Sequence, residues 1–152
     1  MPNDWLPIPH CKQSRPGACL PACAQMVLAN LGDDRSEAQL SRAMDAYWYG
    51  VPASRVTRLT SWGYRVTYEQ TTLAQLRNYL ANQVPCITFL RTGALPNWDT
   101  DTPHAIVLAG LTSDTAYIHD PAGDSGPTAI ELNAFLLAWS DMDHYSATIQ
   151  RG

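Results

Sequence analysis

The chain has 152 residues, of which 45% are hydrophobic and 16% charged, and its formal net charge is −4. Domains most often contain about 100 to 150 residues, so we predict a single domain over residues 1–152. The ten Lys and Arg residues are scattered and form no basic run, which argues against a nucleic-acid partner.

The sequence lacks recognisable targeting signals. Its start, MPNDWLPIPH, has no positive region followed by an apolar stretch, and no apolar run approaches the roughly eighteen residues of a membrane span. We therefore expect a soluble cytoplasmic protein without a membrane span, and leave open its secretion as an effector without a leader. The cysteines at positions 11, 19, 23 and 86 are interpreted as free thiols.

The first half of the chain is predicted to be mainly helical. Prolines at positions 2, 7, 9 and 16 predict an irregular segment over residues 1–18 that lies across the surface. Three helices follow: one from Cys19 to about Leu31 ending before Gly32, one from the N-cap Ser36 to about Tyr47, and a short one from Ser54 to Gly63. Their expected inward residues include Leu40, Met44, Tyr47, Val56, Leu59 and Trp62, and residues 47–50 are expected to form an aromatic turn.

The second half adds most of the predicted strands. In order, we expect a half-exposed strand at 64–68, a helix from Thr72 through Leu80, a buried strand at 85–90, a hairpin of strands 104–111 and 115–119, a helix at 132–139 and a closing strand at 145–150. The loop over residues 92–103 is long enough to suggest a functional role. Helices followed by an antiparallel sheet predict an α+β fold with a cleft between the two parts.

Cys19 is the candidate nucleophile. It follows a Pro-Gly turn at 16–17 and begins the first predicted helix. Unpaired backbone N–H groups and the helix dipole favour negative charge at this position, which lowers the pKa of a thiol. The sequence therefore predicts a reactive thiolate at the start of this helix.

The hairpin supplies a candidate base. If its turn has three residues, Leu111 faces Thr115, and Asp120 becomes a diagonal neighbour of His104. Such neighbours have Cα atoms about 7 to 8 Å apart, within reach of an imidazole-carboxylate hydrogen bond. With Cys19 these side chains form a thiolate-imidazolium pair oriented by a carboxylate. The side-chain amide of Gln13 and the backbone N–H of Cys19 are candidate donors to an oxyanion.

Three blocks of sequence combine these residues. They are Gln13-x5-Cys19-x-Pro21-Ala22-Cys23-Ala24-x-Met26-Val27-Leu28, then Pro103-His104-Ala105-Ile106-Val107-Leu108-Ala109-Gly110, then Ile118-x-Asp120-Pro121-Ala122-Gly123. In this order they resemble the papain-like cysteine peptidases that process bacteriocin leaders, family thirty-nine of the cysteine peptidases, found in peptide ABC exporters and as free-standing relatives. The resemblance implies a papain-like fold with the active site in a cleft between N-terminal helices and a C-terminal antiparallel sheet.

The resemblance also implies a role for each candidate residue. By it, Cys19 is the nucleophile, His104 the general base, Asp120 the residue that orients it, and Gln13 the oxyanion glutamine. The family usually has Gly after the nucleophile and often an acidic residue before it, whereas here Leu20 and Ala18 stand there. We expect Leu20 to add bulk near the cleft and to alter substrate preference, including cleavage after Gly-Gly leaders.

Three functions are compatible with these residues. The first is a cysteine peptidase that cleaves a peptide or protein through a thioester, with no cofactor and no metal. The second is a deamidase or transglutaminase-type modifier, such as an effector or toxin, since water and amines attack the same thioester. The third is a non-catalytic domain that binds an extended peptide. The sequence does not indicate the oligomeric state.

The remaining candidate residues have structural interpretations. Cys23 and Cys86 are expected to be small buried hydrophobes, and the histidines at 10, 119 and 144 to be structural or on the surface. A zinc site of His10, Cys11, Cys19 and Cys23 is disfavoured because the spacing lacks a Cys-x2-Cys pair. Trp98, in the long loop, is either a lid anchor or a packed aromatic.

Overall fold

The computed structural model describes residues 4–47 and 50–152. In these residues an antiparallel sheet has the strand order β1-β6-β2-β3-β4-β5. The strands are β1 (Tyr64–Gln70), β2 (Cys86–Arg91), β3 (Pro103–Leu111), β4 (Thr115–His119), β5 (Thr128–Glu131) and β6 (Tyr145–Arg151). The helices are α1 (Cys19–Asn30), α2 (Glu37–Ala43), α3 (Leu73–Ala81) and α4 (Leu132–Ser140), with 3-10 helices η1 (Ala53–Trp62) and η2 (Thr92–Ala94). No helix in the described ranges is long and apolar enough to cross a membrane.

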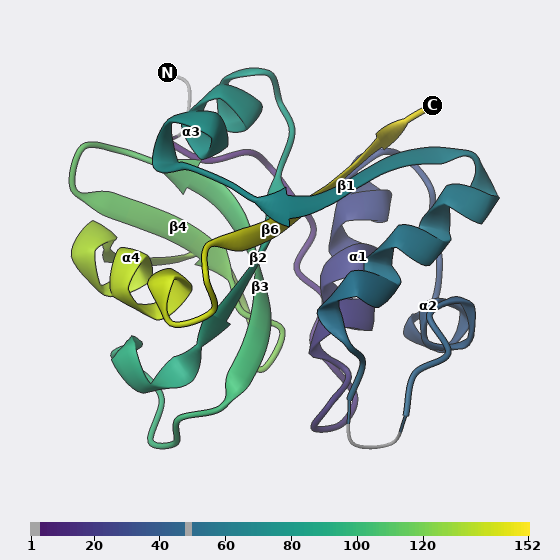
Figure 1. The fold of residues 1–152 in the computed structure, drawn as a ribbon, viewed down its shortest axis with the longest axis horizontal. Helices are drawn as coiled ribbons and strands as arrows, with labels where there is room; N and C mark the ends of the chain where they lie inside the picture. The colour runs from purple at the N-terminus through teal and green to yellow at the C-terminus, as the bar shows by residue number, and fades with distance from the viewer. Residues whose placement is uncertain (1–3, 48–49) are drawn as a thin grey trace.

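The helices cover both faces of the sheet. Figure 1 shows α1 and α2 on one side of it and α3 and α4 on the other. Successive side chains of a strand point to opposite faces, so Val107 of β3 packs in the cluster around α1, whereas Ile106 packs in the cluster around α4. Burial on both faces explains why β2 and β3 read as continuous apolar runs rather than as alternating ones.

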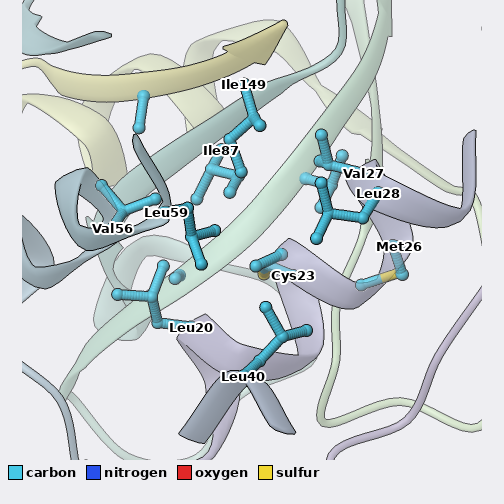
Figure 2. Packing of buried hydrophobic residues seen from close by; sticks show 14 of the residues in the cluster. Leu20, Cys23, Met26, Val27, Leu28, Leu40, Val56, Leu59, Ile87 and Ile149 are labelled. Carbon is cyan, nitrogen blue, oxygen red and sulfur yellow. The ribbon is translucent and has the colours of Figure 1, made fainter. Parts of the chain in front are cut away.

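Helix α1 is the central element of the larger core. Its side chains are buried on nearly all sides, and Figure 2 shows several of them packed against Leu40 of α2, Leu59 of η1 and Ile87 of β2. Each large aliphatic side chain buried in this way contributes about 1.5 to 3 kcal/mol. The N-terminus of α1, where Cys19 lies, is therefore held in a fixed position against the sheet.

The second predicted helix is shorter than expected. Ser36 caps it as predicted, through a capping box with Gln39, but α2 ends at Ala43 instead of near Tyr47. Asp45 has a φ of 53°, which is incompatible with a continuing helix. Tyr47 was expected to face inward and is instead 43% exposed. Of the predicted aromatic turn, Trp48 and Tyr49 lie outside the described residues.

One further prediction of secondary structure needs correction, and one strand was missed. The segment predicted as a short helix from Ser54 is a 3-10 helix that follows Pro52, and the Ser54 side chain does not cap it; it does end at Gly63, whose φ is 90°. Strand β5 was not predicted at all. It pairs with β4 at the edge of the sheet, with Ile118 opposite Thr128. The helix capped by Thr72, with a capping box to Gln75, is confirmed as α3.

The register of the hairpin differs from the prediction at one end only. Leu111 pairs with Ala116, not with Thr115, so the prediction is wrong at the turn. A β-bulge between Leu108 and Gly110 then absorbs the extra residue, and Val107 pairs with His119. This is the register that was predicted for the opposite end of the hairpin, where β3 begins and β4 ends.

Residues 4–18 form an irregular N-terminal strap that crosses the bulge, in agreement with the predicted irregular segment. The backbone N–H of Leu6 donates to the carbonyl of Ala109 at 2.9 Å. A Cβ atom at Gly110 would lie 2.1 Å from the carbonyl oxygen of Asp4, so only glycine permits this close approach. Ile8 of the strap is 6% exposed and belongs to the larger core. The strap is therefore tied to β3 before it reaches Gln13.

Candidate active site

Cys19 is the first residue of α1, as the sequence predicted. Gly17 has a φ of 88°, and the turn it makes is closed by a hydrogen bond of 3.2 Å from the Ala18 N–H to the Arg15 carbonyl. No side chain caps the helix at Ala18. The backbone N–H groups of the first turn are thus left to stabilise negative charge on the Cys19 sulfur.

Leu20 does not occupy the place that was expected of it. Its side chain is 2% exposed and packs in the larger core with residues such as Leu59. Figure 2 shows Leu20 among these core side chains. The expectation that Leu20 adds bulk near the cleft was therefore wrong, because its bulk is directed into the protein.

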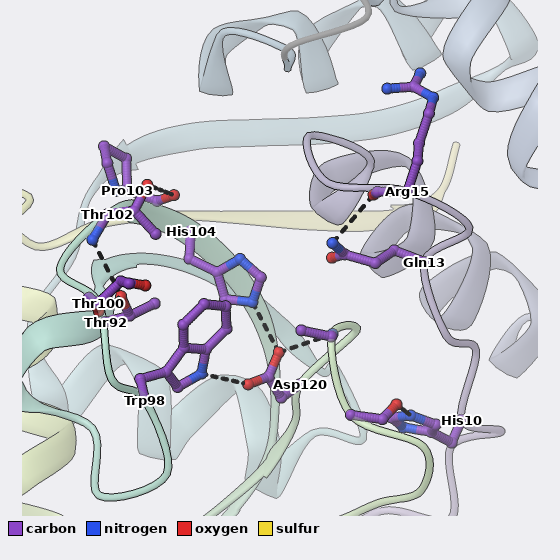
Figure 3. Close-up of polar contacts among 12 residues, drawn as sticks. His10, Gln13, Arg15, Thr92, Trp98, Thr100, Thr102, Pro103, His104 and Asp120 are labelled. Carbon is purple, nitrogen blue, oxygen red and sulfur yellow. Dashed lines mark hydrogen bonds and ion pairs between the residues drawn. The ribbon is translucent and has the colours of Figure 1, made fainter.

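His104 and Asp120 lie together, His104 near the start of β3 and Asp120 directly after β4. Nε2 of His104 and Oδ1 of Asp120 are 2.7 Å apart, and His104 is only 7% exposed. The Asp120 carboxylate also accepts hydrogen bonds from the backbone N–H of Ala122 at 2.9 Å and from the indole Nε1–H of Trp98 at 2.8 Å. Figure 3 shows these contacts around the carboxylate. Three donors therefore hold Asp120 in its ionised form.

The protonation of the His104 ring follows from its partners. Burial lowers the pKa of His104, but hydrogen bonds and charges from Asp120 and Cys19 outweigh it and raise the pKa to about 9. For Asp120, burial raises the pKa, and the bonds from His104, Ala122 and Trp98 bring it below its ordinary value. Because Nε2 is bonded to Asp120, Nδ1 is the nitrogen that faces the thiol. At neutral pH the ring is therefore an imidazolium beside a carboxylate.

Cys19 differs from the other three cysteines in its pKa. Burial raises the pKa of Cys19, but the hydrogen bond and charge of His104, together with backbone hydrogen bonds from Ala105 and Leu20, leave it below the ordinary value. Burial raises the pKa of Cys86 to about 12 and that of Cys23 well above normal, and burial with the charge of Asp34 raises that of Cys11. Cys19 is accordingly the thiol most readily ionised.

Gln13 lies beside the start of α1 and beside the loop that follows Asp120. Its backbone N–H donates to the carbonyl of Pro121 at 2.7 Å. Its side-chain Nε2 donates at 3.1 Å to the Arg15 carbonyl, which also accepts from Ala18, the residue before Cys19. One N–H of the amide is used in this bond, and the second makes no hydrogen bond to another described residue.

Trp98 is the residue of the site whose role the sequence left open. Its ring lies 4.8 Å from that of His104, centroid to centroid, at an angle of 57°. The buried hydroxyl of Thr92 fixes the loop by donating to the Thr100 carbonyl at 2.6 Å and accepting from the Thr102 N–H at 3.1 Å. The one signal in the sequence was a single tryptophan in an unusually long loop.

The described residues contain no group of three or more His, Cys, Asp and Glu side chains that could hold a metal ion. A cavity of about 450 Å³ does lie beside the site, between the loop that carries Trp98 and the end of the β4–β5 hairpin. Its wall includes Trp98 and Asp120. The site therefore combines a thiol, an imidazole-carboxylate pair and an adjoining cavity.

Helices packed on an antiparallel sheet, with the thiol at the start of the central helix and the His-Asp pair on the sheet, give the papain-like cysteine peptidase fold. The family described as "Peptidase_C39 like family" matches residues 5–147. Since this match spans nearly the whole chain, the protein belongs to that family. No curated protein matches the chain.

Solved structures share the fold at low sequence identity. A C39-like peptidase from Bacillus anthracis superposes with a TM-score of 0.81 at 15% identity, covering 99% of each chain. The peptidase domain of Streptococcus ComA, a bifunctional ABC transporter of a quorum-sensing pathway, gives 0.76 at 17% identity, covering 99% of this chain and 100% of that one. A double glycine motif protease from an AMS/PCAT transporter, in complex with the leader peptide, gives 0.77 at 19% identity, covering 99% and 96%.

Proposed function

We propose that the protein is a cysteine peptidase that cleaves a peptide or protein substrate through a thioester on Cys19. One observation carries the proposal: Cys19 interacts with His104, whose other ring nitrogen is bonded to Asp120 at 2.7 Å. The membership of the family and the lowered pKa of Cys19 support it. Gln13, Cys19, His104 and Asp120 are the residues to which we assign the chemistry.

In the first half of the reaction the Cys19 thiolate attacks the carbonyl carbon of the scissile bond. A carbon-sulfur bond forms and the carbonyl electrons move onto oxygen, giving a tetrahedral oxyanion. Nδ1–H of His104 then protonates the leaving amine as the carbon-nitrogen bond breaks, and a thioester remains on Cys19. Asp120 keeps Nδ1 directed at the sulfur and stabilises the imidazolium.

In the second half water hydrolyses the thioester. The neutral His104 takes a proton from the water as its oxygen attacks the acyl carbon, and the carbon-sulfur bond breaks to restore the thiolate-imidazolium pair. In both halves we assign oxyanion stabilisation to the second N–H of the Gln13 amide and to the backbone N–H of Cys19. Each preorganised donor of this kind lowers the activation barrier by about 2.7 to 4 kcal/mol.

A peptide is the substrate class that the comparisons favour. The double glycine motif protease that shares this fold was solved in complex with the leader peptide. The first substrates to test are therefore short peptides, some with Gly-Gly before the scissile bond and some without. The burial of Leu20 leaves both kinds compatible with the site.

A covalent probe tests the proposal directly. The protein is incubated at neutral pH with a thiol-directed peptide probe, and the modified residue is located by mass spectrometry. We expect the adduct on Cys19 and its loss in Cys19→Ala. Cys11, which is partly exposed but has a raised pKa, serves as the internal control for non-specific labelling. Labelling at Cys11 or Cys86 without Cys19 would contradict the assignment.

The other two functions are separated by different measurements. The intact mass of a candidate target distinguishes cleavage, which splits the chain, from deamidation or transamidation, which leaves it whole with a changed mass. A domain that only binds peptide would keep its cellular function in Cys19→Ala. No contact in the site favours either alternative over peptide cleavage.

A further inference from the structure

The cavity of about 450 Å³ lies on the Asp120 side of His104. The two nitrogens of an imidazole lie on opposite sides of the ring, and Nε2 of His104 is bonded to Asp120. Cys19 and Asp120 are therefore on opposite sides of His104. Trp98 and Asp120 form part of the cavity wall, whereas Cys19 and His104 do not. The His-Asp pair thus lies between the sulfur of Cys19 and the cavity.

The cavity is lined by apolar side chains together with polar ones such as Asn97 and Thr100, and its lining carries negative charge. Leu95 and Trp98 come from the loop between β2 and β3, and Ile118 and Ile130 come from β4 and β5. Asp99 also lines the cavity, and no Lys, Arg or His is among its described lining residues. An apolar side chain would lose water there at little cost, whereas a carboxylate would be repelled.

We propose that this cavity holds an apolar side chain from the substrate segment that follows the scissile bond. The inference rests on the proposed peptidase function and adds a substrate class to it. His104 must protonate the leaving amine, so the segment attached to that nitrogen departs past His104. Beyond His104 this segment would meet Trp98, whose ring packs on the imidazole and forms part of the cavity wall.

Cleavage of matched peptides measures the selectivity. The peptides share the residues before the scissile bond and carry Leu, Ala or Asp after it. We expect kcat/KM for Leu to exceed that for Asp by about tenfold or more. Ser125→Trp places an indole at the cavity and should remove the preference, whereas Ser113→Trp, on the exposed turn before β4, should keep it. Equal rates for the three peptides would overturn the assignment.

Binding is measured separately, so that the cavity and the peptidase function can fail independently. Peptides that begin with Leu or Asp are titrated into Cys19→Ala while tryptophan fluorescence is followed, with Cys19→Ala/Trp98→Phe as the control. A change with the Leu peptide only, absent from the control, supports the cavity even if no peptide is cleaved by the wild type. Identical responses to both peptides would contradict it.

A pair of histidines outside the proposed catalytic residues carries a second, independent inference. His119 is wholly buried, and its ring stacks on that of His10 with centroids 5.2 Å apart. The two Nδ1 atoms are 3.0 Å apart, and Nε2 of His10 is 2.8 Å from the carbonyl oxygen of Gly123. A Cβ atom at Gly126 would lie 2.6 Å from Nδ1 of His119 and 2.8 Å from Nδ1 of His10. The backbone of Gly126 therefore packs directly against the two rings, and a larger residue would clash with them.

When both rings are neutral, their hydrogen-bond partners determine which nitrogen of each ring carries the proton. The Gly123 carbonyl only accepts, so Nε2 of His10 carries a hydrogen and Nδ1 of His10 is an acceptor. His119 therefore donates from its own Nδ1. Its Nε2 is buried and has no hydrogen-bond partner among the described residues, so it stays unprotonated. Burial, and repulsion from the His10 ring when that ring is charged, lower the pKa of His119 to about 4.

We infer that His10 is a positioning residue for Gln13, whose proposed oxyanion role the inference presupposes. His10 and Gln13 are both on the N-terminal strap, and both are bonded to the loop that follows Asp120: His10 to Gly123 and Gln13 to Pro121. The histidine pair holds the strap to β4, the strand that ends directly before the proposed catalytic carboxylate. Without it the Gln13 amide would lose part of its alignment with the oxyanion.

His10→Ala tests this role, with Lys12→Ala as its control on the same strap. Lys12 forms an exposed ion pair with Asp124 and should be dispensable. A donor displaced by about 1 Å can cost a large factor in rate, so we expect kcat of His10→Ala to fall by about tenfold or more while KM changes little. Lys12→Ala should retain the wild-type kcat.

Simple alkylation separates positioning from general loss of structure. Reaction of Cys19 with iodoacetamide needs the thiolate but no oxyanion, so its rate should be unchanged in His10→Ala. His10→Gln, which can still donate to the Gly123 carbonyl, should recover part of kcat. An unchanged kcat in His10→Ala, or an equal fall in its alkylation rate, would overturn the inference.

Discussion

The indole of Trp98 donates its N–H to Oδ2 of Asp120, while Oδ1 of the same carboxylate binds His104. The tryptophan ring also packs on the imidazole. A single side chain thus contacts both members of the His-Asp pair and shields their hydrogen bond from water. Lower local polarity strengthens such a bond.

We expect Trp98→Phe to keep the ring contact and lose the hydrogen bond. A hydrogen bond to a charged group is worth about 1.5 to 3 kcal/mol, so kcat/KM should fall by about tenfold or more. Trp139→Phe is the matched control, since it removes an indole bond of 3.0 Å to the Tyr145 carbonyl away from the site. The control should lose stability and keep activity, as measured by thermal unfolding and peptide cleavage. Equal activities of the two variants would show that the Trp98 bond is dispensable.

The dependence of kcat/KM on pH should be bell-shaped. Activity needs the Cys19 thiolate and the protonated His104 together. It should rise as pH passes through the lowered pKa of Cys19, and fall near pH 9 as His104 loses its proton. Asp120 raises the pKa of His104, so Asp120→Asn should move the basic limb to lower pH. An unmoved basic limb in that variant would show that another group titrates there.

Removing the Gln13 side chain should lower kcat more than it raises KM. Loss of one oxyanion donor typically costs about 10² to 10³ in kcat. Gln13→Ala should show this loss in steady-state cleavage and yet retain alkylation of Cys19 by iodoacetamide. The backbone bond from residue 13 to Pro121 does not involve the side chain and should persist. A wild-type kcat in Gln13→Ala would exclude this residue from the oxyanion site.

Two buried threonines four residues apart in the chain should respond oppositely to the same substitution. The hydroxyl of Thr88 is buried with no partner among the described residues, so Thr88→Val should be neutral or stabilising by about 1 kcal/mol. Thr92→Val removes the bonds to Thr100 and Thr102 and should destabilise by about 1 to 3 kcal/mol. Because Thr92 fixes the loop that carries Trp98, Thr92→Val should also lower activity. Chemical denaturation and cleavage assays measure both effects, and a stable, active Thr92→Val would contradict them.

Much of the fold followed from local signals in the sequence. The N-cap Ser36 marked a helix start correctly, because its side chain bonds to the backbone only three residues away. The end of α2 could not be predicted in this way. It depends on Arg55, eleven residues beyond Met44, whose guanidinium binds the carbonyls of Met44 and Asp45. Strand β5 was missed because its four residues are stabilised by pairing with β4 rather than by any pattern of their own.

The candidate site was predictable to the extent that its residues lie in motifs. His104 and Asp120 could be paired from strand alternation because Val107 and His119 are in the assumed register. The assumption about the turn was nevertheless wrong, and the bulge at Ala109 compensated for it. The contact of Trp98 with this pair depends on how Thr92 folds the loop, a tertiary arrangement with no periodic signature. The role of His10 likewise required a partner more than a hundred residues away.

The bulge at Ala109 decouples the register of β3 and β4 at one end of the hairpin from the register at the other end. Pairing on the side of His104 is independent of the register beside Leu111, so changes of length at the tip need not propagate along the strands. Ser113, exposed at that tip, is therefore a suitable point for inserting an affinity tag or a reporter peptide. If the protein were immobilised through this position, the end of the molecule that carries Cys19 would remain open to solution.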